Sequence, residues 1–427
     1  MMPQNSVGRD ASKRTAKFPQ TRFVKGVMIW LAELAIFGMI LACLIVKGPA
    51  WFGLILAFGA VVALAYAKPS LFGQRVGFAL RKGRSSSLRN GAALMQGNRV
   101  FTYTGIAVLV IAYPLLGFSN AYLIHVGAMA GICVILALGL NMTLGTAGLL
   151  DLGYAASYAI GAYVYALTTV HYGLAFSIAL PIAATGSALF GLAVGLAVSR
   201  LKGHYIGLVT LAIGAIVYIL LVNLPGLTGG TDGISHIHAP EAFGHSFRTT
   251  LTVLGRTYPN TVNFYYLVAA FVLLAIIGAE HLDNSRVGRA WAALREDEAA
   301  AECSGVDVRK YRLLAFVTAS FYAGVAGSLF ASMIGYVNPD NFTFSQSLLF
   351  VLMVLLGGSG SVRGAILGAI ALTIIPERLR EFESFRLPLL GVVVLLLMLF
   401  RRQGILPRRI RVRAVPTQSS TSADQET

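Results

Sequence analysis

One carboxylate, Asp151, interrupts a long apolar stretch, and a carboxylate is the side chain best able to do chemistry there. No other Asp, Glu, Lys or Arg lies between Arg99 and Arg200. A carboxylate at membrane depth is costly, so it calls for a role. Three roles fit: capping a helix that begins near Leu152, lining a solute path, or coupling to protons. Glu33 is a second carboxylate in an apolar run, and we assign it no role.

A second candidate is the segment from Val287 to Phe316, which carries five basic and five acidic side chains between two apolar runs. Its first half, "RAWAALREDEAAAE", is rich in helix formers. Gly305 is placed to end this helix, and Asp307 to cap the next one. Trp291 and Leu294 share a helix face. A solvated connection would fit, but neutral mixed charge beside an exposed Trp is more typical of a docking surface.

No catalytic constellation accompanies these residues. The sequence has no HExxH, GxSxG or Walker A motif. Cys43, Cys133 and Cys303 are scattered and predict neither a disulfide framework nor zinc ligands. The "HIH" at 236–238 fits solvated histidines better than a metal site. We therefore expect no catalytic residue, no metal site and no cofactor bound by this chain.

The composition indicates that lipid is the solvent. The 427 residues are 56% apolar and 12% charged, whereas soluble domains carry about 25% charged residues. The net charge of +16 does not indicate nucleic acid, because the basic residues occupy short connections between apolar runs. We expect an all-α polytopic membrane protein: a transmembrane helix bundle with broken or re-entrant glycine-rich helices and roughly 10–12 membrane segments.

Twelve apolar runs position the candidate residues. They lie at about 26–46, 50–67, 101–118, 121–142, 146–170, 177–199, 204–223, 262–280, 313–335, 345–358, 363–376 and 387–400. If all twelve cross, 28 of the 34 Lys and Arg residues fall on the side of both termini. This bias predicts that both termini are cytoplasmic.

Two glycine-rich breaks at membrane depth suggest a pathway through the bundle. They are "GLNMTLGTAGLLDLGYAASYAIGAYVYAL" (Gly139–Leu167) and "LLGGSGSVRGAILGA" (Leu355–Ala369). Irregular backbone is tolerated there only where protein or a water cavity surrounds it. Small residues also recur every four positions, as Gly153, Ser157 and Gly161 do. Tight helix packing is sufficient to explain most of these small residues.

Three classes of function remain from the residues alone: a permease driven by a partner, a secondary carrier or channel working alone, and a membrane enzyme or scaffold. Few buried carboxylates argue against an ion gradient, and the missing catalytic motifs argue against an enzyme. A partner that supplies energy would need a docking surface, which the charged segment offers.

At this segment the sequence resembles the permeases of ABC importers for branched-chain amino acids. The stretch Val287–Ala331, the Gly139–Leu167 stretch, "TGGTDGI" (Thr228–Ile234) and "RQGILP" (Arg402–Pro407) carry the resemblance, which covers about residues 101–410. The extension before residue 100 resembles the longer, M-type permeases. Urea permeases are close relatives and remain the alternative, with other small-solute ABC permeases and a stand-alone carrier.

The resemblance implies a complex in the bacterial inner membrane. A second, H-type permease, two P-loop ATPases that bind ATP and Mg²⁺, and a soluble binding protein for leucine, isoleucine or valine would be partners. The implied organisation is a basic tail, two-span extension and basic loop at 1–100, a permease core at 101–400 with a coupling helix near 287–305, and a basic C-terminal tail at 401–427.

The resemblance also implies two groups of site residues. Trp291 and Leu294 would anchor the coupling helix in an ATPase, and its charged residues would set register. The expected ATPase-coupling residues are Gly288, Arg289, Trp291, Leu294, Arg295, Glu296, Asp297, Glu298 and Gly305. The expected translocation-path residues are Asn141, Gly145, Gly148, Asp151, Tyr154, Gly161, Thr228, Gly229 and Gly230.

Overall fold

The computed structural model describes residues 121–201, 203–242, 245–247, 251–253, 256–258, 260–378, 391 and 404–406. All of them lie in the second of the two units into which the chain divides, Arg99–Thr427. The expected extension at 1–100, with Glu33 and Cys43, the run at 101–118, all but one residue of the run at 387–400 and most of the C-terminal tail lie outside the described residues.

The described residues build helices, apart from two short antiparallel hairpins. The longer helices are α6 (Ala121–Leu140), α7 (Tyr154–Tyr172), α8 (Phe176–Val198), α9 (Tyr205–Asn223), α11 (Thr261–Asn284), α12 (Arg286–Glu296), α14 (Val308–Ile334), α15 (Phe344–Gly357) and α16 (Val362–Arg378). The short elements are the π-helix η1 (Asn141–Thr146), α10 (Pro225–Thr228), η2 (Gly230–Asp232), β1 (Glu241–Ala242), β2 (His245–Ser246), β3 (Leu251–Val253), β4 (Arg256–Tyr258), α13 (Glu298–Cys303) and η3 (Pro339–Phe342).

Six segments of the described chain are long and apolar enough to cross a membrane. They are Ala121–Thr146, Phe176–Val198, Tyr205–Asn223, Thr261–Asn284, Val308–Ile334 and Pro339–Gly357. α7, which is rich in tyrosine, and α16, with 17 residues, are not among the six. The prediction of an all-α polytopic protein is confirmed, and the total of 10–12 segments stays a prediction.

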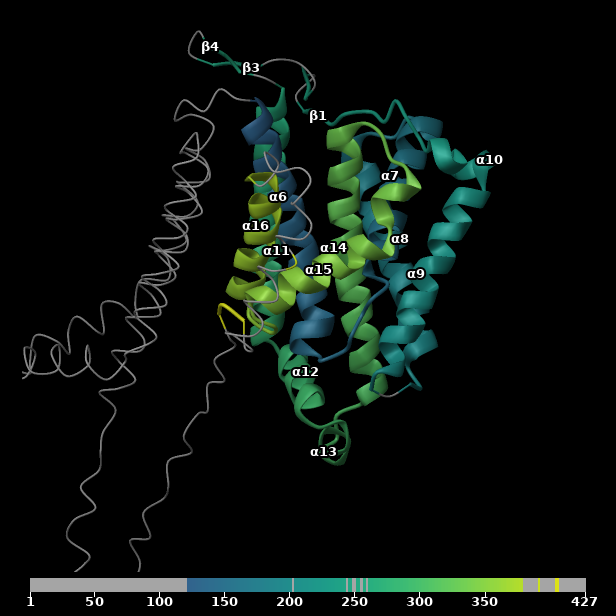
Figure 1. Cartoon of the computed structure of the whole chain (residues 1–427), viewed down its shortest axis with the longest axis vertical. Coiled ribbons are helices and arrows are strands. Elements are labelled where there is room, and N and C mark those ends of the chain that lie inside the picture. The colour runs from purple at the N-terminus through teal and green to yellow at the C-terminus, as the bar shows by residue number, and fades with distance from the viewer. Residues whose placement is uncertain are drawn as a thin grey trace, which may run out of the picture. The chain divides into compact units, whose positions relative to one another are not determined.

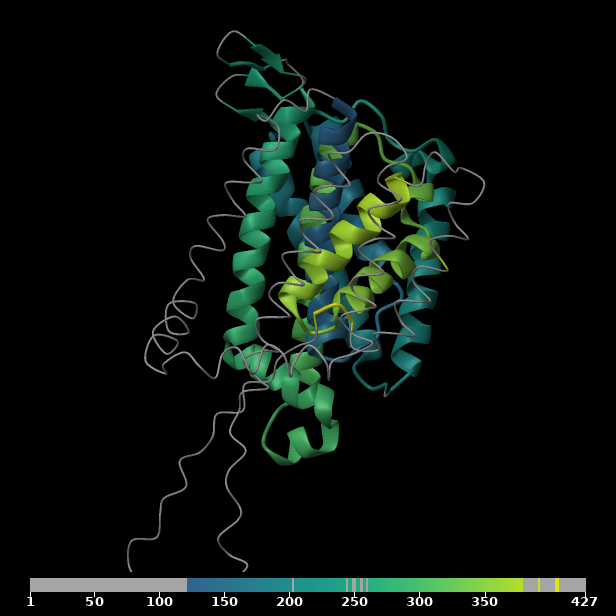
Figure 2. The same ribbon diagram turned by 60° about the vertical axis from the view of Figure 1, so that its left-hand side comes forward.

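α14 is the central helix of the bundle. It packs against α6, α7 and α8, while α11 and α16 pack against α6 (Figure 1). α15 and α16 pack against each other and run obliquely across α6 (Figure 2). α12 and α13 lie at one end of the bundle, and α10 and the hairpins lie at the opposite end (Figure 1).

The first glycine-rich break contains the non-helical residues 147–153, which end next to the helix start that the sequence predicts near Leu152. The predicted apolar runs at 121–142 and 146–170 have the wrong ends, because α6 continues through η1 to Thr146 and α7 starts at Tyr154. A π-helix holds one extra residue per turn and keeps the backbone bonded where an α-helix would stop. Gly148, with φ 74°, then takes the chain out of the helix.

Candidate transport site

α12 is fixed at both of its ends by short polar side chains. The Ser285 hydroxyl accepts hydrogen bonds from the backbone N–H groups of Val287 and Gly288. At the other end, Asp297 leaves the helix with φ −158°, and its carboxylate accepts from Ala300 N to cap α13. The predicted single coupling helix is therefore wrong: the segment is two helices, because the Asp297 side chain favours a new cap over the helix interior.

The termini of this segment agree with the sequence. α13 ends at Cys303, and Gly305 follows in the left-handed conformation with φ 82°. Asp307 caps α14 by accepting from Lys310 N at 3.2 Å. Gly288 has a packing reason as well, since a Cβ there would overlap the carbonyl oxygens of Leu282 and Asp283.

Trp291 and Leu294 do share a face, but that face is turned into this chain. Trp291 is 0% exposed and its Nε1 donates to the carbonyl of Tyr311 at 2.8 Å; Leu294 is 3% exposed. The expectation of an exposed Trp that anchors a partner is therefore wrong. The Trp291 hydrogen bond fixes α12 to the start of α14. Burial of both apolar side chains removes apolar surface from water and stabilises this arrangement.

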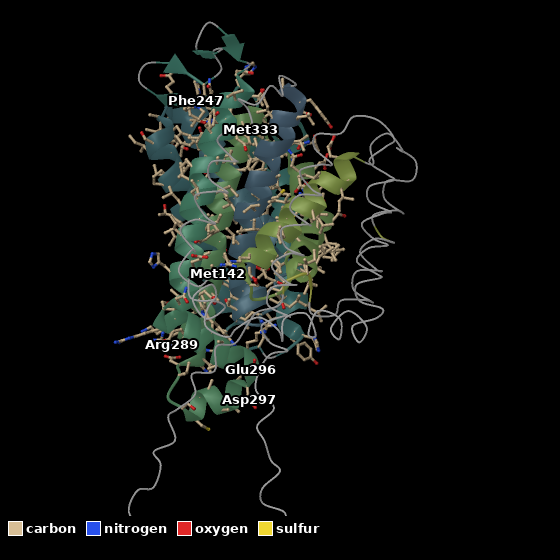
Figure 3. The ribbon with its side chains drawn as sticks, turned by 90° about the vertical axis from the view of Figure 1, so that its left-hand side faces the viewer. Met142, Phe247, Arg289, Glu296, Asp297 and Met333 are labelled. Carbon is tan, nitrogen blue, oxygen red and sulfur yellow. The ribbon has the colours of Figure 1, made fainter. Side chains whose placement is uncertain are left out.

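The solvent-facing side of α12 and α13 carries charge and small residues. Figure 3 shows Arg289 pointing away from the bundle. Glu296 and Asp297 lie at the end of the bundle that α12 and α13 form. The exposed residues of the two helices and their link are Arg286, Arg289, Ala293, Arg295, Glu296, Asp297, Ala299, Ala300, Glu302 and Cys303. We call this side the α12–α13 surface.

Glu298, expected to face a partner, instead forms an ion pair with Arg312 at the start of α14. The Arg312 side chain is 3% exposed and also donates to the carbonyls of Ser199 at 3.3 Å and Leu201 at 2.8 Å. A buried guanidinium needs such acceptors. The pair thus joins α13, α14 and the connection between α8 and α9.

Arg295 reaches from α12 into both glycine-rich breaks. Its Nη1 donates to the carbonyl oxygen of Gly145 in η1 and lies 3.4 Å from the carbonyl of Ser359. Its Nη2 donates to the Ser359 hydroxyl at 3.1 Å. Gly148 lies against the same side chain, since a Cβ there would be 2.9 Å from Arg295 Cγ.

The two breaks meet each other directly, and we call residues 141–146 and 358–361 together the crossing. Asn141 is fully buried, and its Oδ1 accepts from Gly360 N at 2.9 Å. A Cβ at Gly145 would overlap both Asn141 Oδ1 and Gly360 N, so only glycine permits this approach. Segments more than 200 residues apart in the sequence therefore form one site.

Residues 404–406, which belong to the "RQGILP" sequence near the C-terminus, also lie next to the crossing. Ile405 N donates to the Leu356 carbonyl and Leu406 N donates to the Gly357 carbonyl, each at 2.9 Å. Gly404, with φ 76°, lies against Gly358. The core boundary predicted at residue 400 stays a prediction, and residues 404–406, just beyond it, pair with the end of α15.

Asp151 is buried just before α7 and serves its N-terminus. Its Oδ1 accepts from Gly153 N at 3.0 Å, which closes a turn just before the helix. The predicted cap by Asp151 is wrong, because α7 begins at Tyr154 and its N-cap residue is Gly153. Two residues that the sequence did not single out bond the backbone at this helix start. The Thr210 hydroxyl accepts from Leu152 N at 3.0 Å, and the Ser347 hydroxyl accepts from Ala155 N at 2.9 Å.

Tyr154 and Gly161 lie where α7 packs against neighbouring helices, and not at the crossing. The buried Tyr154 hydroxyl donates to the Ala319 carbonyl at 3.1 Å, and its ring packs edge-on against Phe350. A Cβ at Gly161 would overlap the Cα of Gly324 in α14. These contacts support the helix-packing interpretation of the small residues.

Thr228, Gly229 and Gly230 lie at the opposite end of the bundle from α12 and α13 (Figure 1). They form a tight turn in which Thr228 Oγ1 donates to the carbonyl of Leu221 at 2.6 Å and accepts from Gly230 N at 3.2 Å. The predicted path residues thus fall into three groups: one at or next to the crossing, one in the packing of α7 against α14, and one at the end of the bundle opposite α12 and α13.

Sequence reasoning missed several residues of the site. Ser359 and Gly360 lie in a recognised break but were not chosen, and nothing in the local pattern distinguishes Arg312 from its charged neighbours. In the described part of the chain, no three His, Cys, Asp or Glu side chains gather closely enough to hold a metal ion.

Comparisons with known proteins show which proteins this chain is similar to. A family model described as "Branched-chain amino acid transport system / permease component" matches residues 122–401. The high-affinity branched-chain amino acid transport system permease protein LivM of Escherichia coli K12 is 41% identical over 71% of this chain and 73% of its own length.

More distant relatives match the same core. The LivH permease of the same bacterium is 26% identical over 61% of this chain and 88% of its own. The autoinducer 2 import system permease LsrC of Enterobacter sp. 638 is 30% identical over 68% and 84%. No solved structure matches the chain. The chain is a transport permease and belongs to the family of branched-chain amino acid transport system permease components.

Proposed function

We propose that this chain is the M-type permease of an ATP-driven importer for leucine, isoleucine and valine in the bacterial inner membrane. Its greater identity to a LivM than to a LivH protein supports the M-type assignment. Its partners would be an H-type permease, two P-loop ATPases and a soluble binding protein. ATP and Mg²⁺ would bind to the ATPases, and no cofactor and no nucleic acid to this chain.

The α12–α13 surface carries this proposal. It ends the bundle on one side, exposes Glu296 and Glu302, and is fastened to α14 by Trp291 and by the Glu298–Arg312 pair. A partner that moves this surface would move the start of α14, the central helix. We assign the ATPase contact to the exposed Arg289, Glu296 and Glu302, and an internal fastening role to Trp291, Leu294 and Glu298.

The same end of the bundle would face the cytoplasm, together with both termini. Exposed Arg286, Arg289, Arg309 and Lys310 lie there, and positive charge near span ends marks the cytoplasmic side. The solute path would pass the crossing, with Asn141, Gly145 and Gly148 at its narrow part and Asp151 near it. Thr228, Gly229 and Gly230 would lie on the side where the binding protein delivers solute.

Co-purification tests the ATPase contact. Glu296→Lys combined with Glu302→Lys reverses two charges on the α12–α13 surface without touching a buried contact. We expect the native chain to carry P-loop ATPases through purification in mild detergent and this variant to lose them. Glu241→Lys, an exposed charge reversal at the opposite end, is the matched control and should retain them. A native chain that purifies alone and still transports would overturn the proposal.

Another small solute is a second candidate, because a relative at 30% identity is named for autoinducer 2 import. Uptake of labelled leucine into vesicles that hold the whole complex distinguishes the two. Leucine uptake that isoleucine and valine inhibit supports the branched-chain assignment. No leucine uptake, together with uptake of labelled urea by the same vesicles, supports a urea permease.

A further inference from the structure

The crossing and the α12–α13 surface are joined by the Arg295 side chain. Trp291 fastens α12 to the Tyr311 backbone, and Glu298 fastens α13 to Arg312. α12, α13 and the first turns of α14 therefore form one body. From this body the Arg295 guanidinium extends to acceptors on both halves of the crossing, Gly145 and Ser359.

We propose that Arg295 is a positioning residue that holds the crossing closed and releases it when the α12–α13 body moves. The inference rests on the proposed function, in which partner ATPases move that body. It changes the role of Arg295 from a partner contact to an internal link. Among the described residues, withdrawal of the guanidinium would leave the hydrogen bond between Asn141 and Gly360 as the side-chain link across the crossing.

A guanidinium suits this task because its planar fork presents donors on two sides at once. Nη2 reaches the Ser359 hydroxyl, while Nη1 reaches the Gly145 carbonyl in a segment far away in the sequence. A lysine ammonium at the end of a thinner stem is a single point charge. It would bond one half of the crossing and leave the other half free.

The closed crossing also contains a group that favours opening. Because Asn141 Oδ1 accepts from Gly360 N, its amide cannot be turned around without placing two N–H donors together. Asn141 Nδ2 is consequently buried with no acceptor among the described residues. A buried unpaired donor is costly, and it gains an acceptor once solute or water enters. Arg295 thus holds closed a site that Asn141 biases toward opening.

The test measures solute imported per ATP hydrolysed by the reconstituted complex of native or variant chain with its partners. Arg295→Ala should keep ATP hydrolysis and lower this ratio about tenfold or more, because hydrogen bonds to a charged group are lost. Arg295→Lys should not restore it, and Ser359→Ala should lower it less. Arg309→Ala is the matched control: an exposed arginine of the same charged segment that lies outside the α12–α13 surface.

The outcomes separate the two proposals. A native complex without ATP-dependent import overturns the proposed function. A native complex that imports, together with an Arg295→Ala complex of unchanged solute-to-ATP ratio, overturns only the role of Arg295. Import restored by Arg295→Lys would likewise overturn it, since a point charge would then suffice.

A distance measurement covers the case in which Arg295→Ala does not assemble. Spin labels at Ala293→Cys on α12 and Arg363→Cys at the start of α16 keep Arg295 in place, and both positions are exposed. The native cysteines are replaced by serine. We expect the label distance to change between the ATP-free complex and the complex trapped during hydrolysis. An unchanged distance would contradict the release of the crossing.

Discussion

The junction of α7, α8 and α14 and the crossing both depend on small residues, yet they are closed in different ways. At the junction the backbones touch: Gly161 lies on Gly324, and the Ser187 hydroxyl lies 2.7 Å from the carbonyl oxygens of both Ser157 and Ser320. At the crossing two side chains, Arg295 and Asn141, bridge segments that the backbone alone would not hold.

This difference separates a frame from a moving part. Backbone contacts between small residues cannot be released without pulling helices apart, so the junction keeps one geometry. A side-chain bridge is released by a rotation of a few torsions. The crossing adds an unpaired buried donor, Asn141 Nδ2, whereas Ser187 at the junction has acceptors on two other helices. Stability variants should therefore act at the junction, and coupling variants at the crossing.

The largest loss of stability is expected at the junction. Gly161→Ala would place a Cβ onto the Gly324 backbone and separate α7 from α14, at a cost of about 3 kcal/mol. Thermal unfolding in detergent measures it. Gly186→Ala is the matched control, because its Cβ would lie 3.6 Å from Val164 Cγ2, an ordinary contact. Equal melting temperatures for the two variants would contradict the rigid junction.

A smaller loss is expected where the α12–α13 body is fastened. Glu298→Gln removes the charge that faces buried Arg312, which should cost about 2 kcal/mol, less than a fully buried pair because Glu298 is 35% exposed. Glu302→Gln, on the exposed side of α13, should leave the melting temperature unchanged. If both variants melt alike, Glu298 does not fasten the body.

The hydrogen bonds at the junction should contribute less to the free energy of unfolding than its close backbone packing does. Ser187→Ala removes a donor shared between Ser157 and Ser320 and should cost about 1 kcal/mol. Ser199→Ala is the comparison, because that hydroxyl bonds only Leu196 in its own helix. A melting temperature equal to that of Ser199→Ala would show that backbone contact alone holds the junction.

The smallest effect is expected at Asp151. The oxygen of an asparagine side chain accepts from Gly153 N as the carboxylate does, so Asp151→Asn should import solute within about twofold of the native chain. Loss of import with normal assembly would assign the charge itself to the solute path or to proton coupling. This variant therefore separates a structural role of Asp151 at the start of α7 from the two roles that need its charge.

Local physics made much of the fold predictable. The cap at Asp307, the end of α13 before Gly305 and the packing of Gly161 follow from propensity, left-handed backbone and small-residue spacing. Eight of the twelve apolar runs correspond to described helices, with errors mainly at their ends.

The remaining features depend on contacts between residues far apart in the chain, which the spacing of residues in the sequence does not reveal. Trp291 is amphipathic, and only the position of Tyr311 decides that it faces inward. The sequence holds many arginines, and the meeting of Arg295 with Gly145 is fixed by how helices pack rather than by local pattern. Helix propensity alone predicts one helix through Asp297. The Asp297 side chain instead bonds the backbone as the N-cap of α13, which interrupts the run of helix-forming residues.

The start of α7 has a consequence for biogenesis. The amide of Leu152, just before this helix, donates to Thr210, 58 residues later in the chain. The amide of Ala155, in its first turn, donates to Ser347, 192 residues later. When α7 is synthesised, neither acceptor exists yet, and α7 is not among the strongly apolar segments. We expect α7 to settle in the bilayer only after α15 arrives, so that translation order, and not apolarity alone, decides when the bundle closes.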